Sequence, residues 1–155
     1  MSELGIYIVW QSGERYINNI IDDIDERFDI LDAQSLHWSN DIVFKNLNKL
    51  YPHRKFKKKS SKVKEIGARE DGVRLHAIVV LDRNENIVDG VNLNFKNLKF
   101  NYREKYKTNF FHSADNEKEA IDNIKQILNI DLSNYADSQN KFIIFDNNYS
   151  KLLKS

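Results

Sequence analysis

The chain has 155 residues, of which 41% are hydrophobic and 30% are charged, and its formal net charge is +1. This composition is typical of a globular protein, and the length predicts a single domain over residues 1–155. Cysteine is absent, which excludes disulfides, thiolate metal sites and cysteine nucleophiles, and we expect a cytoplasmic protein. We predict neither a signal peptide nor a membrane span, because the N-terminus lacks a basic region and no apolar run approaches about 18 residues.

The first part of the chain alternates between predicted strands and helices. Residues 5–10 form a continuous run of β-branched and aromatic residues, which predicts a buried strand. Apolar residues then recur at spacings of three and four up to Phe28, as in an amphipathic helix. Residues 28–38 predict a second strand. The polar cluster Ser39-Asn40-Asp41 predicts the start of a helix that ends at Pro52.

Residues 53–64 form a strongly basic segment, which we predict to be an exposed loop or an irregular helix. It contains no acid, and its cations are Arg54, Lys55, Lys57, Lys58, Lys59, Lys62 and Lys64. Such a segment could bind the phosphates of a nucleotide or a nucleic acid in a salt-dependent way. Phe56 is its only aromatic residue, which disfavours base stacking on nucleic acid. A solvated lysine-rich loop is the alternative.

Residues 73–82 carry the strongest strand pattern in the chain. Residues 87–107 leave two alternatives open. A strand is indicated by the alternation of Val91, Leu93 and Phe95, whereas a helix face is indicated by the spacing of Leu98, Tyr102 and Tyr106.

The last third of the chain predicts a short strand, a helix and a further strand. The short strand contains Phe110-Phe111, and Asp115 or Asn116 would cap the helix that follows. An apolar run at residues 142–146 would add a C-terminal strand. This order of elements predicts a ferredoxin-like α/β (α+β) sandwich, in which helices pack on one face of an antiparallel sheet.

Two segments of the chain resemble nucleoside diphosphate kinase. The first is Ile6-Tyr7-Ile8-Val9-Trp10-Gln11-Ser12-Gly13, which is followed by a predicted helix and a second strand, like the opening of that family. The second is Asn109-Phe110-Phe111-His112-Ser113-Ala114-Asp115-Asn116, which is similar to the family's Asn-Ile-Ile-His-Gly-Ser-Asp-Ser segment. The resemblance runs in order over residues 5–128.

The resemblance implies a phosphotransferase that carries a γ-phosphate on a histidine between a nucleoside triphosphate and a diphosphate. His112 would be the catalytic nucleophile, because a neutral imidazole nitrogen can attack phosphorus near pH 7. Magnesium would accompany the triphosphate, and self-association is expected, since related kinases form oligomers. The residues that would bind the nucleotide or its phosphates are Asn109, Lys99, Arg103, Arg54 and Lys55.

Several positions depart from the family's pattern. The lysine that ends the first strand is Trp10 here, and the serine two residues after the histidine is Ala114. The glutamate that positions the histidine, eleven residues after it, is Asn123. The proline-rich nucleotide-binding loop is also missing, because Pro52 is the only proline. These changes predict an altered donor or acceptor rather than ordinary nucleoside diphosphate exchange.

Three alternatives stay open beside the phosphotransferase. His112 could be a hydrogen-bonded histidine at a strand-to-helix turn, in a catalytically silent protein that binds a nucleotide or a sugar nucleotide, for example in surface-polysaccharide synthesis. The basic segment 53–64 could instead bind a nucleic acid or an acidic partner. Lys99 and Arg103 could form a solvated surface. A permanent metal site is not predicted, because cysteines and a His-x-x-x-His spacing are missing.

Overall fold

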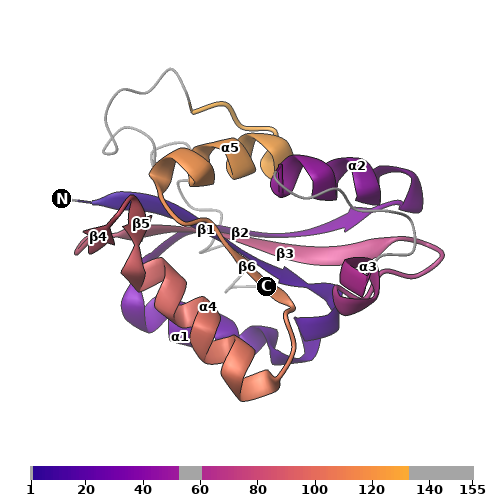
Figure 1. Ribbon diagram of the computed structural model, residues 1–155, viewed down its shortest axis with the longest axis horizontal. Helices are drawn as coiled ribbons and strands as arrows, with labels where there is room; N and C mark the ends of the chain where they lie inside the picture. Colours follow the sequence, from indigo (N-terminus) through magenta and orange to yellow (C-terminus); the bar gives the residue numbers. More distant parts are fainter. Residues whose placement is uncertain (1, 53–60, 133–155) are drawn as a thin grey trace.

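The computed structural model describes residues 2–52 and 61–132. Arg54, Lys55 and the predicted strand at residues 142–146 lie outside these ranges. Figure 1 shows a central sheet whose four strands have the order β2-β3-β1-β6, with all neighbours antiparallel. Its strands are β1 (Glu3–Trp10), β2 (Asp29–Trp38), β3 (Val73–Asp82) and β6 (Phe111–Ser113).

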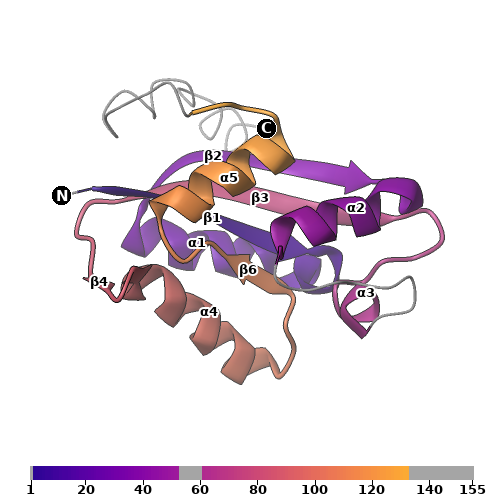
Figure 2. The same ribbon diagram turned by 45° about the horizontal axis from the view of Figure 1, so that its top comes forward.

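Helices cover both faces of this sheet. Figures 1 and 2 show α1 (Ile17–Arg27) and α4 (Leu93–Tyr106) against one face, with α2 (Asn40–Leu50) and α5 (Glu117–Leu128) against the other. The predicted α+β sandwich is confirmed, but its helices do not all lie on one face. The reason is that every residue of β1 is buried, so both faces of the central strands need an apolar cover.

The two short helices lie at the ends of strands. A 3-10 helix, η1 (Gln11–Tyr16), links β1 to α1, and α3 (Ser61–Glu65) follows the part of the basic segment outside the described residues. No helix in the described ranges combines the length and hydrophobicity of a membrane span.

The ambiguous region 87–107 contains both a hairpin and a helix. β4 (Ile87–Val88) and β5 (Val91–Asn92) form a two-stranded hairpin, and α4 begins immediately after it. The Asn92 side chain caps α4 by accepting a hydrogen bond from the Asn94 backbone N–H at 3.1 Å. The helix interpretation is therefore correct from Leu93 onward, and the strand alternation was accidental there.

Strand β1 sets which side chains share a face. Tyr7 points toward α4, where its ring lies 6.1 Å from that of Phe95 between centroids, and it also stacks on Phe111 of β6 at 4.9 Å. Gly5 lies on the same face, and a Cβ there would come within 2.5 Å of Phe95, so glycine permits the close approach of α4. Ile8 points to the opposite face, because successive residues of a strand alternate. Ile8 is also the register partner of His112, which places His112 on the face covered by α5.

Candidate active site around His112

His112 is the middle residue of β6, and the residue is only 3% exposed. The Nε2 atom lies 2.9 Å from Oδ1 of Asn123 on α5. An amide oxygen only accepts, so Nε2 carries the ring hydrogen and donates it. The Nδ1 atom then carries a lone pair, and it is buried without a hydrogen-bond partner within the described ranges. This arrangement fixes the ring's tautomer and aims a basic nitrogen away from Asn123.

The surroundings keep the imidazole of His112 neutral. Burial lowers its pKa to about 3, although the hydrogen bond with Asn123 opposes that shift. The positive charges of Lys99 and Lys62 lower the pKa further, which means that two cations act on the ring. A neutral histidine flanked by cations can attack or bind a phosphoryl group, because the cations offset the phosphoryl charge.

Tyr51 covers the histidine. It follows the last residue of α2, and its ring meets the imidazole edge to face at 5.0 Å between centroids. The ammonium of the buried Lys62 lies 5.2 Å from the centre of the same ring, a cation–π distance. The sequence gives no sign that Tyr51 belongs to the site, because a tyrosine at the end of an amphipathic helix has no distinguishing spacing. Lys62 was noted only as one cation of the basic segment.

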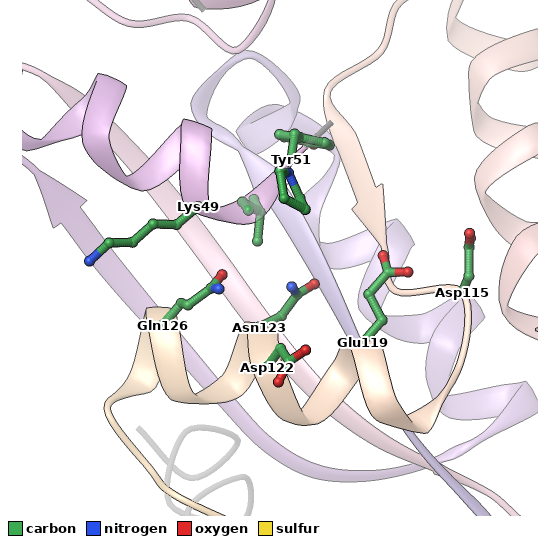
Figure 3. A pocket seen from close by; sticks show the side chains of 9 residues that line it. Lys49, Tyr51, Asp115, Glu119, Asp122, Asn123 and Gln126 are labelled. Atoms are coloured by element: carbon green, nitrogen blue, oxygen red, sulfur yellow. The ribbon is translucent and has the colours of Figure 1, made fainter. Parts of the chain in front are cut away.

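A pocket of about 510 Å³ adjoins this cluster between the end of α2 and α5. Figure 3 shows Glu119 and Asn123 rising from α5 toward Tyr51. The residues that line the pocket are Lys49, Leu50, Tyr51, Pro52, Asp115, Glu119, Asp122, Asn123 and Gln126. Burial and the nearby Asp115 raise the pKa of Glu119. The carboxylates make this pocket a poor match for an unaccompanied phosphate, but they are oxygen ligands of the type that Mg²⁺ prefers.

Lys99 acts electrostatically on both the pocket carboxylates and His112. Its side chain is partly buried, and burial together with the nearby Arg103 lowers its pKa. Asp115 and Glu119 act in the opposite direction, so Lys99 lies within electrostatic range of the pocket carboxylates as well as of His112. Lys99 and Arg103 both belong to α4, four residues apart.

A second pocket, of about 490 Å³, brings two other predicted residues together. Arg103 and Asn109 both line it, with Glu65, Lys107 and Thr108. The residues predicted to bind a nucleotide therefore lie in two places. Lys99 lies near His112, whereas Arg103 and Asn109 line the second pocket. Arg54 and Lys55 lie outside the described residues, so their predicted roles stay predictions.

Two departures from the kinase pattern, Trp10 and Ala114, are buried among apolar side chains. Trp10 is fully buried and meets Trp38 edge to face at 5.6 Å between ring centroids. Ala114 is also buried and packs in the cluster that contains Leu4 and Ile6. Asp115 does not cap α5, since Asn116 accepts the hydrogen bond from the backbone N–H of Glu119. Asp115 is thereby available to the pocket.

Among the described residues, no group of three or more His, Cys, Asp or Glu side chains could hold a metal ion. The carboxylates of the α5 pocket fit magnesium only as partial ligands. Magnesium commonly takes its remaining ligands from water and from substrate phosphates.

No protein-family model and no curated protein matches the sequence. Solved structures do match. The nucleoside diphosphate kinase of Encephalitozoon cuniculi aligns with a TM-score of 0.53 at 14% identity, covering 91% of this chain and 99% of that protein. The chain has the fold of the nucleoside diphosphate kinases. The kinase of Aquifex aeolicus gives 0.52 at 14% identity, covering 82% of this chain and 95% of that one.

A third structure, of a nucleoside diphosphate kinase family protein from Babesia bovis, aligns with a TM-score of 0.52 at 12% identity. It covers 81% of this chain and 87% of that one. At such identities the likeness to the kinases concerns the fold alone. What this chain does must therefore be argued from its own site.

Proposed function

We propose that this protein is a phosphotransferase of the nucleoside diphosphate kinase fold, with an altered substrate, that carries a phosphoryl group on Nδ1 of His112. The observation that supports it is the free lone pair of that atom. Asn123 holds the opposite nitrogen at 2.9 Å, and burial keeps the ring neutral with a pKa of about 3. Lys62 and Lys99 supply positive charge beside the ring.

In the proposed reaction, the Nδ1 lone pair attacks the γ-phosphorus of a nucleoside triphosphate. The bond from that phosphorus to the bridging oxygen breaks, and the oxygen of the nucleoside diphosphate leaves with the electron pair. The Nε2 hydrogen stays on the ring and keeps its bond to Asn123. An acceptor oxygen then attacks the phosphohistidine, which restores the neutral imidazole. Magnesium bound with the nucleotide would offset charge on its phosphates.

Access to Nδ1 requires movement of Tyr51. The Nδ1 atom is enclosed, and the Tyr51 ring lies against the imidazole at 5.0 Å between centroids. Tyr51 stands directly after α2 ends at Leu50, and its backbone N–H bonds to the Leu47 carbonyl, so the proposed movement is one of the side chain and not of the helix. Catalytic contacts are often formed only in the substrate complex, so an enclosed nitrogen is compatible with the proposal.

The test is incubation with γ-labelled nucleoside triphosphates and Mg²⁺, followed by acid and alkali treatment. We expect an alkali-stable, acid-labile label that His112→Ala abolishes. His37→Ala is the matched control, because His37 is exposed on β2 and away from the cluster. Asn123→Asp should keep the label, since it keeps an acceptor for Nε2, whereas Asn123→Leu should lose it. Absence of label with every triphosphate, or a label that survives in folded His112→Ala, would contradict the proposal.

A second candidate, a silent protein that binds a nucleotide or sugar nucleotide, is favoured by the enclosure of Nδ1. Arg103 and Asn109 line an open pocket that could hold such a ligand without chemistry at His112. This candidate predicts that the ligand raises the melting temperature in wild type and in His112→Ala alike, without labelling. An Asn109→Ala variant should lose the shift. A ligand panel that never raises the melting temperature would remove the candidate.

Binding through the basic segment 53–64 and self-association both stay predictions. Replacement of Lys57, Lys58 and Lys59 together with a salt titration tests the first, since phosphate contacts weaken steeply with salt. Sedimentation of the full chain tests the second.

A further inference from the structure

A second histidine cluster lies on the other face of the sheet. His76 on β3 pairs with Val9 of β1 and with Ser35 of β2, whereas His112 pairs with Ile8. Because Ile8 and Val9 are consecutive in one strand, their partners project from opposite faces. The cluster around His76 is therefore separate from the site around His112.

Three elements supply the cluster. Ser35 Oγ on β2 lies 2.8 Å from Nδ1 of His76. The Nε2 atom of His76 lies 3.1 Å from Oε1 of Glu14 on η1. A hydroxyl, an imidazole and a carboxylate are thus joined in series, in the order nucleophile, base and orienting acid.

Arg74 holds the carboxylate at the end of this series. Its Nη2 donates to Oε2 of Glu14 at 2.9 Å, and its Nε lies 3.1 Å from Oε1. The hydrogen bond from Arg74 lowers the pKa of Glu14, so the carboxylate is ionised and only accepts. The Arg74 backbone N–H in turn donates to Oε1 of Gln11 at 2.8 Å, which ties the start of η1 to β3.

These contacts determine where the hydrogens lie. An ionised Glu14 accepts a hydrogen bond from Nε2–H of His76, so in this tautomer Nδ1 carries the lone pair. The Ser35 hydroxyl must then donate to Nδ1. A serine hydroxyl that donates to a correctly oriented imidazole is in the state from which a general base removes its proton.

We propose that Ser35 is a nucleophile for acyl transfer from small activated carboxylic esters, with His76 as its general base and Glu14 as the positioning residue. Ser35 Oγ attacks the ester carbonyl carbon, and its proton moves to Nδ1 of His76. The tetrahedral intermediate collapses, the bond to the leaving alcohol oxygen breaks, and that oxygen takes the proton from His76. Water then hydrolyses the acyl-serine through the same base, which releases the carboxylic acid.

The exposure of the cluster sets the substrate class. Ser35 is exposed, and the His76 side chain is 16% exposed, so a small acyl donor reaches both. An open site stabilises an oxyanion much less than a site that excludes water. General base catalysis contributes roughly 10²–10⁴-fold on its own. We therefore expect reaction with esters that have a good leaving group and none with amides.

The experiment is treatment of the full chain with p-nitrophenyl acetate, with acid quenching at short times and mass-spectrometric mapping of acetyl groups. Ser39 is the internal reference, because it is exposed and its side chain makes no capping hydrogen bond. We expect acetylation of Ser35 at least about a hundredfold faster than that of Ser39. His76→Gln should reduce the Ser35 rate to the Ser39 rate, and Glu14→Gln should reduce it partly.

Mapping is required because exposed histidines and lysines also react with this ester. The acetyl group on Ser35 must vanish in Ser35→Ala, and Ser39→Ala must leave it unchanged. Circular dichroism confirms that each variant is folded. The proposal is overturned if Ser35 reacts no faster than Ser39 in the wild type. Equal Ser35 rates in the wild type and a folded His76→Gln variant also overturn it.

Discussion

His112 and His76 lie on opposite faces of one sheet, and their imidazole rings differ in burial and in hydrogen-bond partners. Both have Nε2 held by an oxygen, from the Asn123 amide at 2.9 Å in one case and from the Glu14 carboxylate at 3.1 Å in the other. His112 is enclosed and leaves Nδ1 unpaired, whereas His76 is partly exposed and shares Nδ1 with Ser35. Burial and the partner of the second nitrogen, rather than the residue type, therefore decide what each imidazole can do.

The largest expected effect is a pH dependence of stability caused by His112. Its folded pKa is lowered to about 3, so the unfolded state binds a proton as the pH falls through about 6.5 while the folded state does not. Stability should fall by up to about 1.4 kcal/mol per pH unit between these values. Urea unfolding at pH 7, 5 and 4 measures it, and His112→Gln should flatten the curve.

Val43→Ala is the control for this experiment, because it shortens a buried side chain of α2 and leaves the histidine in place. It should lower the whole curve and keep the slope. Equal slopes in wild type and His112→Gln would show that the imidazole is not held neutral.

A pH dependence of opposite sign is expected from Glu3, which anchors the helix that carries Asn123. Glu3 Oε1 accepts a hydrogen bond from the Glu117 backbone N–H at 2.7 Å at the start of α5. Burial raises the pKa of Glu3 to about 7, although the bond from Glu117 opposes this. The unfolded state loses its proton first, so stability should fall as the pH rises from about 4.5 to about 7.

Glu3→Gln removes the ionisation and keeps an acceptor for Glu117. Its unfolding free energy should decline less than that of the wild type between pH 5 and pH 8, as measured by urea titration. Parallel curves for the two proteins would refute this assignment.

The hydrogen bond between Asn123 and His112 should contribute less to the free energy of unfolding than these pH effects, but its contribution should be measurable. Asn123→Leu leaves the buried Nε2–H unpaired, at a cost of about 1–3 kcal/mol. Replacing both partners, in Asn123→Leu with His112→Phe, removes the unpaired donor. The double variant should be more stable than the sum of the two single changes predicts, which a double-mutant cycle measures. Additive effects would mean that the two side chains do not interact.

The smallest effect on stability is expected in the exposed cluster around His76. Arg74→Met breaks the ion pair with Glu14, in which the side chains are 51% and 32% exposed. Exposed pairs contribute little to stability and are screened by salt. The stability difference from the wild type should be smaller than that of Asn123→Leu, and it should disappear at high salt. A loss that persists at about 1 M salt, where the Debye length is roughly 3 Å, would contradict a solvent-screened pair.

The sequence predicted helices and strands well wherever burial dictates the pattern of apolar residues. The strand at residues 73–82 coincides with β3, and the periodicity up to Phe28 predicted α1. The pattern failed between Val91 and Phe95, because a two-residue hairpin strand runs directly into a helix there and imitates alternation. The prediction of helices on one face alone was wrong, since a continuous apolar run such as β1 needs an apolar cover on both faces.

The histidine segment was the part of the site that the sequence could indicate. His112 stood out because its neighbours resemble a known pattern, and the resemblance also pointed to position 123, where Asn123 replaces the family's glutamate and still contacts the ring. Tyr51 and Lys62 could not be assigned, since they reach the histidine from other elements. Ser35 and His76 are 41 residues apart, and no local pattern links them.

The sequence by itself determined the pattern of apolar residues, and with it most strands and helices. These depend on local periodicity, which the chain contains at every point. Only the tertiary structure decided which side chains meet each imidazole, because strand register and helix packing join residues that are far apart in the chain. Those contacts decide which oxygen meets Nε2 of each imidazole, and burial lowers the pKa of His112.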